Sequence, residues 1–274
     1  MLRLLNIQKG KSMTTNTPVL AIEGLTKHYG GVRALTDAQF QLMPGEHAAI
    51  VGDNGAGKST FVRLITGVEQ PNKGNIVLDG QSVEFDSPLD ARDQGIETVY
   101  QNLALAEDLD VPANIFLGRE ITRLNLGPLS FLNHGEMRKQ SVEMLKTTGV
   151  KIQDLSESMR GMSGGQRQCV AIARAAGFAT KLIILDEPTA ALGVQETARV
   201  EDIIRGLKQR GVPLIIISHN LRQVFDLVDR IWVFRQGRII CSRRTVETNP
   251  EEIVGLITGA IDPASLTSQE AVAC

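Results

Sequence analysis

Three runs of consecutive apolar residues predict buried β-strands in this chain. They cover Ala48–Val51, Leu182–Leu185 and Val212–Ile217. Apolar runs without an alternating polar face are typical of strands that are covered on both sides, as in a parallel sheet. Other segments carry apolar residues at helical spacing, and they predict helices over Thr60–Ile65, Arg167–Gly177 and Val194–Arg210. This alternation of strands and helices predicts an α/β fold with a mostly parallel sheet.

The first part of the chain predicts a second group of strands. They cover Val19–Glu23, Ala38–Leu42 and Gly74–Gly80, and turn residues flank them. Short strands between turns are typical of an antiparallel layer, which we expect beside the main sheet. Pro88–Gln94 then predicts a short helix, and Gly95–Tyr100 predicts a strand that ends at Gln101.

Residues 102–163 have a different pattern. Helical segments such as Gly135–Thr147 are broken by Pro112 and by the pair Gly127-Pro128. We expect a helical subdomain inserted between two strands of the main sheet. The sequence leaves open whether a partner protein contacts this subdomain or solvent surrounds it. Farther on, Asp229–Phe234 and Arg238–Ser242 predict a hairpin, and Pro250–Thr258 predicts a terminal helix.

These patterns divide the chain into one folded domain and two ends. Residues 18–259 are expected to form the domain. Residues 1–17 are polar and lack periodicity, so we expect a disordered leader, with Met13 as an alternative start. Residues 260–274 are small and polar, which predicts a flexible tail.

Composition and charge narrow the range of partners. The formal net charge of the 274 residues is −2, which argues against nucleic acid as a ligand because it provides no global basic field. The three cysteines share no close spacing, which favours a reducing compartment over a disulfide framework. No apolar run is long enough to span a bilayer. We therefore expect a cytosolic protein that reaches a membrane only through a partner.

The loop between the first buried strand and its helix has the composition of a phosphate cradle. It reads Gly52, Asp53, Asn54, Gly55, Ala56, Gly57, Lys58, Ser59 and Thr60. The glycines allow positive φ and bring backbone N–H groups onto an anion at a helix N-terminus. Lys58 would reach the β and γ phosphates of a nucleotide, and the Ser59 hydroxyl would bind Mg²⁺. The alternative is an ordinary glycine-rich turn, which the flanking strand and helix disfavour.

Polar side chains follow two of the other buried strands. Asp186 and Glu187 come directly after one strand, and His219 follows another. The carboxyl ends of parallel strands are where ligands bind in such folds. Asp186 would hold Mg²⁺, and Glu187 would polarise a water molecule against the γ phosphate. His219 would hydrogen-bond the γ phosphate, although a lone histidine is more often structural.

Two further segments allow two interpretations each when taken alone. Ser163, Gly164, Gly165 and Gln166 precede a predicted helix, so they form either a second anion site or an ordinary capped helix start. Tyr29 lies in a Gly-Gly turn ahead of the phosphate loop, where it either stacks on a base or packs against the first sheet.

The order of these motifs resembles that of the ATP-binding subunits of ABC transporters, over about Val19 to Ile257. Gly52–Ser59 matches the Walker A loop, Gln101 the Q-loop and Met162–Gln166 the family signature. Leu182–Asp186 matches Walker B, Glu187 the catalytic base, His219 the switch histidine and Tyr29 the adenine-stacking aromatic. The resemblance implies that Gln101, with Ser59 and Asp186, contacts Mg²⁺ and senses the γ phosphate. It also implies that the segment Ser163–Gln166 and Tyr29, which each allowed two interpretations, belong to the nucleotide site.

The resemblance has consequences for assembly. In this family two ATP-binding domains face head to tail, and each ATP lies between one phosphate loop and the signature helix of the other domain. A chain with one copy of each motif is then expected to form a homodimer. The family also implies an integral membrane permease, a periplasmic sugar-binding protein as an indirect partner, and a peripheral place on the cytoplasmic face of the inner membrane.

Finer features are similar to the monosaccharide importers of the ribose and fructose type. They are the stretches Tyr100–Leu105, Asn114–Glu120, Thr189–Gly193 and Ile217–Asn220. Most members of that subclass carry two fused ATP-binding domains, and this chain carries one. Gly193 stands where the wider family has Asp in its D-loop. The alternatives are a motor for another cargo, such as an amino acid or an exported lipid, a soluble ATPase acting on nucleic acid or ribosomes, and a nucleotide-binding scaffold without turnover.

Overall fold

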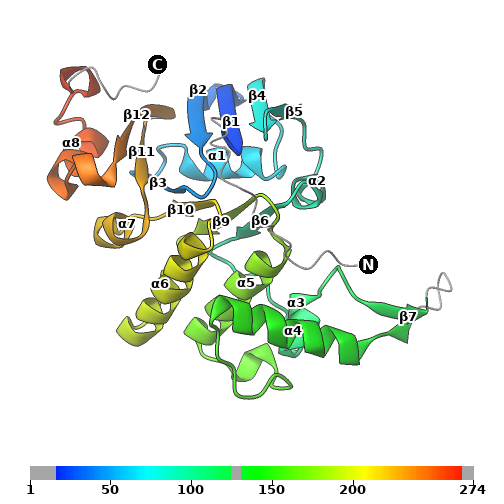
Figure 1. Ribbon diagram of the computed structural model, residues 1–274. Helices are drawn as coiled ribbons and strands as arrows, with labels where there is room; N and C mark the ends of the chain where they lie inside the picture. The colour runs from blue at the N-terminus through cyan, green and yellow to red at the C-terminus, as the bar shows by residue number, and fades with distance from the viewer. Residues whose placement is uncertain (1–16, 125–130, 267–274) are drawn as a thin grey trace.

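The structure is a computed structural model, and it describes residues 17–124 and 131–266. Residues 1–16 of the predicted leader and residues 267–274 of the predicted tail lie outside the described residues. Figure 1 shows the arrangement of the layers, with an antiparallel sheet on one side of a central sheet and a group of helices on the other. Within the described ranges, no helix combines the length and the apolar character needed to cross a membrane.

The central sheet has six strands in the order β12-β11-β3-β10-β9-β6. The five strands from β11 to β6 run parallel, and β12 pairs antiparallel at one edge. The bounds are β3 (His47–Gly52), β6 (Ile96–Val99), β9 (Leu182–Asp186), β10 (Leu214–Ile217), β11 (Arg230–Arg235) and β12 (Arg238–Arg244). This confirms the predicted α/β fold with a mostly parallel sheet, and β11 and β12 form the predicted hairpin.

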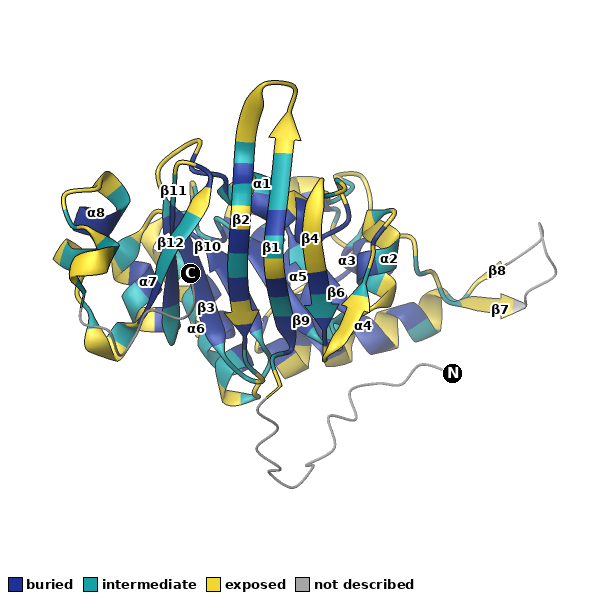
Figure 2. Ribbon diagram, turned by 90° about the horizontal axis from the view of Figure 1, so that it is seen from above, coloured by how far each residue is buried: buried dark blue, intermediate teal, exposed yellow. Residues whose placement is uncertain are grey.

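The second sheet is antiparallel and has the order β2-β1-β4-β5. Its strands are β1 (Leu20–Tyr29), β2 (Val32–Leu42), β4 (Lys73–Leu78) and β5 (Gln81–Val83). Strands β1 and β2 are longer than the sequence predicts. The reason is a set of register shifts, the first between Ile22 and Leu25, that interrupts the alternation of apolar residues. Figure 2 shows the exposed end of this hairpin projecting from the sheet.

Eight α-helices surround the sheets in the described part of the chain. They are α1 (Lys58–Ile65), α2 (Pro88–Asp93), α3 (Val111–Ile115), α4 (His134–Thr148), α5 (Gly164–Phe178), α6 (Val194–Gln209), α7 (Leu221–Leu227) and α8 (Pro250–Thr258). Short 3₁₀ helices cover Met159–Gly161, Thr245–Glu247 and Pro263–Ser265. Helix α7 is absent from the sequence predictions, although Leu221, Val224 and Val228 have helical spacing, because its seven residues are shorter than the window in which such a period is judged. The Asn220 side chain caps it by accepting from the Gln223 N–H.

The segment 102–163 is not purely helical. Besides α3 and α4 it contains a short antiparallel pair, β7 (Thr122–Leu124) with β8 (Phe131–Leu132). Two strands of this length give too few residues for a period to show in the sequence.

The first residues of the predicted flexible tail are ordered. The Ile261 N–H donates to the Gly255 carbonyl (3.0 Å), and the Ile261 side chain packs against buried apolar residues.

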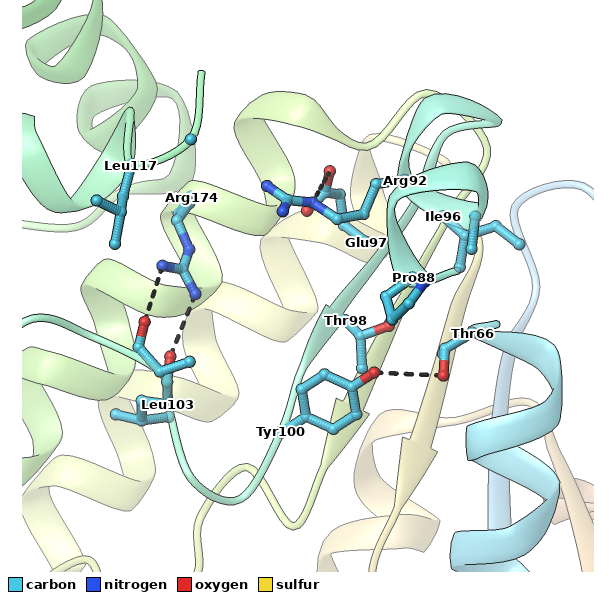
Figure 3. Close-up of a pocket in the computed structure, with 13 residues that line it drawn as sticks. Thr66, Pro88, Arg92, Ile96, Glu97, Thr98, Tyr100, Leu103, Leu117 and Arg174 are labelled. Atoms are coloured by element: carbon cyan, nitrogen blue, oxygen red, sulfur yellow. Dashed lines mark hydrogen bonds and ion pairs between the residues drawn. The ribbon is translucent and has the colours of Figure 1, made fainter. Parts of the chain in front are cut away.

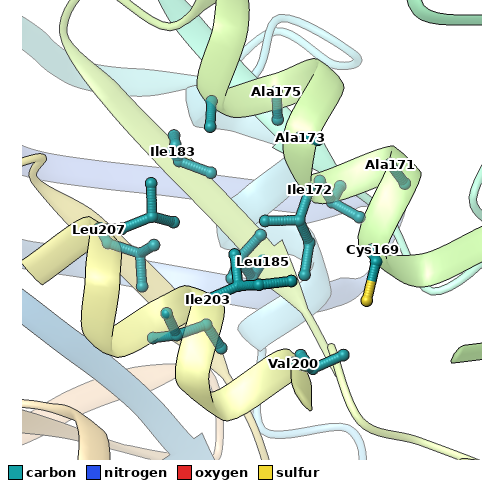
Figure 4. Close-up of a cluster of buried hydrophobic side chains, with 14 of the residues drawn as sticks. Cys169, Ala171, Ile172, Ala173, Ala175, Ile183, Leu185, Val200, Ile203 and Leu207 are labelled. Atoms are coloured by element: carbon teal, nitrogen blue, oxygen red, sulfur yellow. The ribbon is translucent and has the colours of Figure 1, made fainter. Parts of the chain in front are cut away.

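The central sheet separates two apolar clusters. Successive side chains of a strand point to opposite faces, so Ile50 packs with the antiparallel sheet and α1, whereas Val51 packs with the helices of the other layer. In Figure 4, Ile183 and Leu185 of β9 lie between Ile172 of α5 and Leu207 of α6. This packing on both faces fixes the central strands, and it fixes the height of the loops at their carboxyl ends.

Candidate nucleotide-binding site

The loop from Gly52 to Gly57 connects β3 to α1 and has the backbone that the sequence predicts. Gly52, Gly55 and Gly57 have positive φ values of 150°, 81° and 105°. A Cβ atom at Gly52 would lie 2.3 Å from the Phe234 carbonyl oxygen, so no larger residue fits there. Gly57 is the N-cap of α1 and has no side chain to cap it. The first-turn N–H groups of α1 are therefore left for an anion.

Lys58 is the first residue of α1, and its side chain reaches back to this loop. Its Nζ donates to the carbonyl oxygens of Gly52 (2.6 Å) and Asp53 (2.9 Å). Burial lowers the pKa of Lys58, and the nearby carboxylates of Glu187, Asp53 and Asp186 act in the opposite direction. The ammonium group is thus close enough to the carboxylates at the end of β9 to interact with their charge. Of the remaining predicted loop residues, Asn54 and Ser59 are exposed, Thr60 is half-buried and Ala56 is buried.

Three strand ends bring the predicted chemistry to one edge of the sheet. Ile217 of β10 pairs with Ile50 of β3 on one side and with Asp186 of β9 on the other. The three strands consequently end at the same level of the sheet. This places the phosphate loop, the two carboxylates and His219 side by side at its edge. The Glu187 N–H donates to the Ile217 carbonyl (2.9 Å), and Glu187 has a φ of 49°. This left-handed backbone turns its side chain away from the direction of the strand.

Glu187 and His219 are in direct contact. The His219 Nδ1 lies 2.8 Å from the Glu187 Oε1. With a proton on Nδ1, the imidazole donates to the carboxylate and its other nitrogen, Nε2, lies on the far side of the ring. The His219 side chain is 77% exposed, whereas that of Glu187 is 19% exposed. The pair therefore presents an open imidazole face next to a sheltered carboxylate.

Asp186 has the environment of a cation ligand. Its pKa is raised, first by burial and then by the charge of Glu187, and Lys58 only partly offsets both effects. A divalent cation would relieve this excess of negative charge. The predicted donors Ser59, Gln101 and Asp186 offer only oxygen atoms to a cation, which suits Mg²⁺. No group of three or more His, Cys, Asp or Glu side chains in the described ranges is arranged to hold a metal ion by itself, so phosphate oxygens would complete such a site.

Gln101 follows β6 at the same edge and is exposed. Arg174 of α5 holds the chain just after it, donating to the carbonyl oxygens of Leu103 (3.2 Å) and Ala104 (3.3 Å). Figure 3 shows this clamp beside a cavity of about 340 Å³ that residues of α2, β6 and α5 line. Arg174 is not among the residues that the sequence singles out. The available signal was a single charged residue within the apolar stretch 170–176.

Ser163, Gly164, Gly165 and Gln166 form the start of α5. Ser163 Oγ accepts from the Gln166 N–H (3.2 Å), and Gln166 Oε1 accepts from the Ser163 N–H (2.8 Å), which is a capping box. Gly164 lines a cavity together with Gln101. No hydrogen bond found in the described ranges joins this segment to the loop at Gly52–Ser59. The structure therefore gathers Lys58, Asp186, Glu187 and His219, and it shows no direct bond between them and the segment at 163–166 in the described ranges.

Tyr29 ends β1, and the residue is 41% exposed. Its hydroxyl donates to the Glu69 carboxylate, and the Lys27 Nζ lies 5.3 Å from the ring centre. The tyrosine thus stands at the rim of the antiparallel sheet rather than within it, and one face of its ring has a cation beside it.

A glycine-rich strand–loop–helix cradle with a lysine, followed on neighbouring strands by a carboxylate pair and a histidine, defines a P-loop nucleotide-binding protein. The chain belongs to the ABC transporter family, whose model matches residues 35–190.

Relatives and solved structures agree with this assignment. The chain is 46% identical over 249 residues to a fructose import ATP-binding protein from Rhizobium meliloti, covering 90% of this chain and 96% of that protein. It is 44% identical to a xylose/arabinose import ATP-binding protein from Sulfolobus acidocaldarius, covering 88% and 94%. A crystal structure of an ATP-binding cassette of an ABC transporter in its ADP conformation superposes with a TM-score of 0.74 at 25% identity, covering 88% of this chain and 95% of that one.

Proposed function

We propose that this chain is the ATP-hydrolysing motor subunit that powers import of a monosaccharide through a partner membrane permease. The observation that carries the proposal is the meeting of Lys58, Asp186, Glu187 and His219 at one edge of the sheet. The similarity to two sugar import ATP-binding proteins over nearly their whole length supports the cargo class.

The residues of this edge have distinct roles in the proposed reaction. Lys58 and the first-turn N–H groups of α1 bind the β and γ phosphates. Glu187 accepts a proton from the attacking water molecule. His219, oriented by its 2.8 Å contact with Glu187, directs its outer nitrogen to the terminal phosphate. Ser59, Asp186 and Gln101 would hold Mg²⁺, which neutralises charge on the phosphates when it is bound.

We propose a homodimer, because the chain carries one copy of each of the two predicted anion sites. The chain has one phosphate loop and one segment at 163–166, and Ser163 bonds to Glu196 and Gln166 rather than to the loop. Two copies arranged head to tail would complete two sites, each closed by a helix N-terminus of the partner. ATP would then close the dimer and hydrolysis would open it. A permease would couple this motion to transport, with a periplasmic sugar-binding protein upstream and the motor at the cytoplasmic face of the membrane.

Replacement of Glu187 by Gln tests the catalytic part of the proposal. We expect ATP to bind normally and hydrolysis to fall by about 10²–10⁴-fold, since a general base typically contributes that much. ATP should convert the variant to a dimer in size-exclusion chromatography. The matched control is Asp202→Asn, which removes a carboxylate from the exposed side of α6 and should leave hydrolysis unchanged. Hydrolysis by E187Q at the wild-type rate would contradict the role of Glu187.

Sugar uptake tests the transport part. A strain without this gene should lose uptake of one or more sugars in a panel of pentoses and hexoses. The wild-type chain should restore uptake and E187Q should not. Unchanged sugar uptake with loss of amino acid uptake would favour the alternative cargo.

A further inference from the structure

The carboxylate of Glu196 lies against the N-terminus of α5. Its Oε1 accepts from the Ser163 hydroxyl (2.8 Å) and from the Gly165 N–H (3.2 Å). Its Oε2 accepts from the Gly193 N–H (3.3 Å) at the start of α6. The Glu196 side chain thus joins the start of α5 to the loop between β9 and α6.

The two helices approach closely at this point. A Cβ atom at Gly165 would lie 2.6 Å from the Glu196 Cβ, so only glycine fits. Gly164 is less crowded, because its nearest neighbour would be a Leu192 methyl group at 3.6 Å. The contact between Glu196 and the start of α5 is therefore specific to one of the two glycines.

The hydrogen bonds to Glu196 use the donors that a phosphate would need. The Ser163 hydroxyl has a single proton, and Glu196 accepts it. The Gly165 N–H likewise has one proton, and the same oxygen atom accepts it. A terminal phosphate offers acceptors and negative charge. It cannot share these protons with a carboxylate without strong repulsion.

We propose that Glu196 occupies, in each separate subunit, the anion site that α5 offers to the terminal phosphate bound by its partner. Closure of the dimer by ATP then requires the carboxylate to leave Ser163 and Gly165. Glu196 sets the ATP concentration at which the dimer closes and is not a catalytic residue. This inference rests on the proposed function, because it needs a nucleotide that a second copy presents to α5.

The ionisation of Glu196 is consistent with this competition. Hydrogen bonds from Ser163, Gly193 and Gly165 lower the pKa of its carboxyl group, so the group is charged at neutral pH. The charge of Arg199 acts in the same direction with a smaller effect. The occupant of the site is thus an anion, like the ligand that would replace it.

If Glu196 served only to cap α6, its Oε2 atom would be sufficient. The contact of Oε2 with Gly193 is an N-terminal cap for α6, and it does not involve α5. Glu196→Gln keeps an oxygen acceptor at this position and removes the charge. Glu196→Asp keeps the charge at the helix start but shortens the reach toward Ser163. Both variants should weaken the competition between residue 196 and the terminal phosphate for Ser163 and Gly165. Only Glu196→Gln also changes the charge at the start of α6.

The experiment measures dimer formation as a function of ATP concentration in an E187Q background, where hydrolysis does not interfere. We expect E196Q to lower the ATP concentration for half-maximal dimer about fivefold, which corresponds to about 1 kcal/mol. E196D should lower it in the same direction. The control D202N, on the solvent side of the same helix, should change it less than twofold.

A double-mutant cycle links the effect to the serine. In an S163A background, the shift caused by E196Q should be smaller than in the presence of Ser163, because one of the two donors that Glu196 occupies is gone and the Gly165 N–H remains. With Glu187 present, E196Q should lower KM for ATP and leave kcat within about twofold. A half-maximal concentration that is unchanged or raised in both E196Q and E196D would overturn the inference. Absence of any ATP-dependent dimer in E187Q itself would instead refute the proposed function.

Discussion

His47 is a buried base at the start of β3, the strand that carries the phosphate loop at its other end. The residue is 0% exposed. Its Nε2 contacts the Val212 carbonyl (3.1 Å), and its Nδ1 has no hydrogen-bond partner in the described part of the protein. Burial, and next the positive charge of Lys208, lowers the pKa of His47 from 6.5 to about 4.

This shift makes folding stability depend on pH in a defined direction. The folded state favours the neutral imidazole, so the stabilisation is complete above the unfolded-state pKa of 6.5 and is lost as pH falls toward about 4. The full loss is about 3 kcal/mol, and the part lost between pH 7 and pH 5 is about 2 kcal/mol. That is a large fraction of the stability of a typical domain.

His47→Gln should remove this dependence, because the amide reaches the Val212 carbonyl and does not titrate. Urea unfolding at pH 7, 6 and 5, followed by the fluorescence of the one tryptophan, buried Trp232, measures the effect. The wild type should lose about 2 kcal/mol more than H47Q over this range. His28→Gln, at an exposed position on β1, is the control and should follow the wild type. Equal losses in H47Q and the wild type would show that the buried imidazole is not held neutral.

Three other substitutions, two of them paired with a control substitution, give separate tests. Lys58→Ala should weaken ATP binding about 100-fold in calorimetry, because it removes a charged donor worth about 3 kcal/mol, and unchanged affinity would exclude Lys58 from phosphate binding. Gly52→Ala should destabilise the fold by more than about 2 kcal/mol in urea because of its backbone clash, whereas Gly55→Ala, with no neighbour within 4 Å, should lose only about 1–2 kcal/mol to its φ. Phe40→Ala should lose about 3–5 kcal/mol from the core, against less than about 0.5 kcal/mol for Phe131→Ala, which is 65% exposed, and similar losses would contradict the packing argument.

The central sheet could be predicted because its strands are buried on both faces. Continuous apolar runs such as Leu182–Leu185 have few alternatives, and the polar residues after them must then lie at the sheet edge. The structure places Glu187 and His219 at that edge, and it adds a direct contact between them that the sequence did not predict. The roles assigned to these residues stay predictions. The antiparallel layer was predicted only in outline, since register shifts in β1 disturb the period of two that reveals a strand.

Residues that act through partners distant in the sequence could not be found from a local pattern. Arg174 holds carbonyl oxygens at positions 103 and 104, and backbone carbonyls leave no trace in the sequence. His47 looks like one polar residue at a strand start, and only the packing around it shows that it is buried. Glu196 has a local signal, the spacing of a capping box, which accounts for its bond to Gly193 but not for its bond to Ser163.

The contact between Glu196 and Ser163 makes the N-terminus of α5 different from that of α1. At α1 the cap is a glycine and no side chain takes the first-turn N–H groups. At α5 a carboxylate of the same chain takes one of them, together with the serine hydroxyl. The phosphate loop is thus ready to receive a nucleotide, whereas the helix that would close on it already holds an anion. Binding to one subunit and closure of two are then separate steps with separate free energies, and nucleotide binding to the phosphate loop should come first.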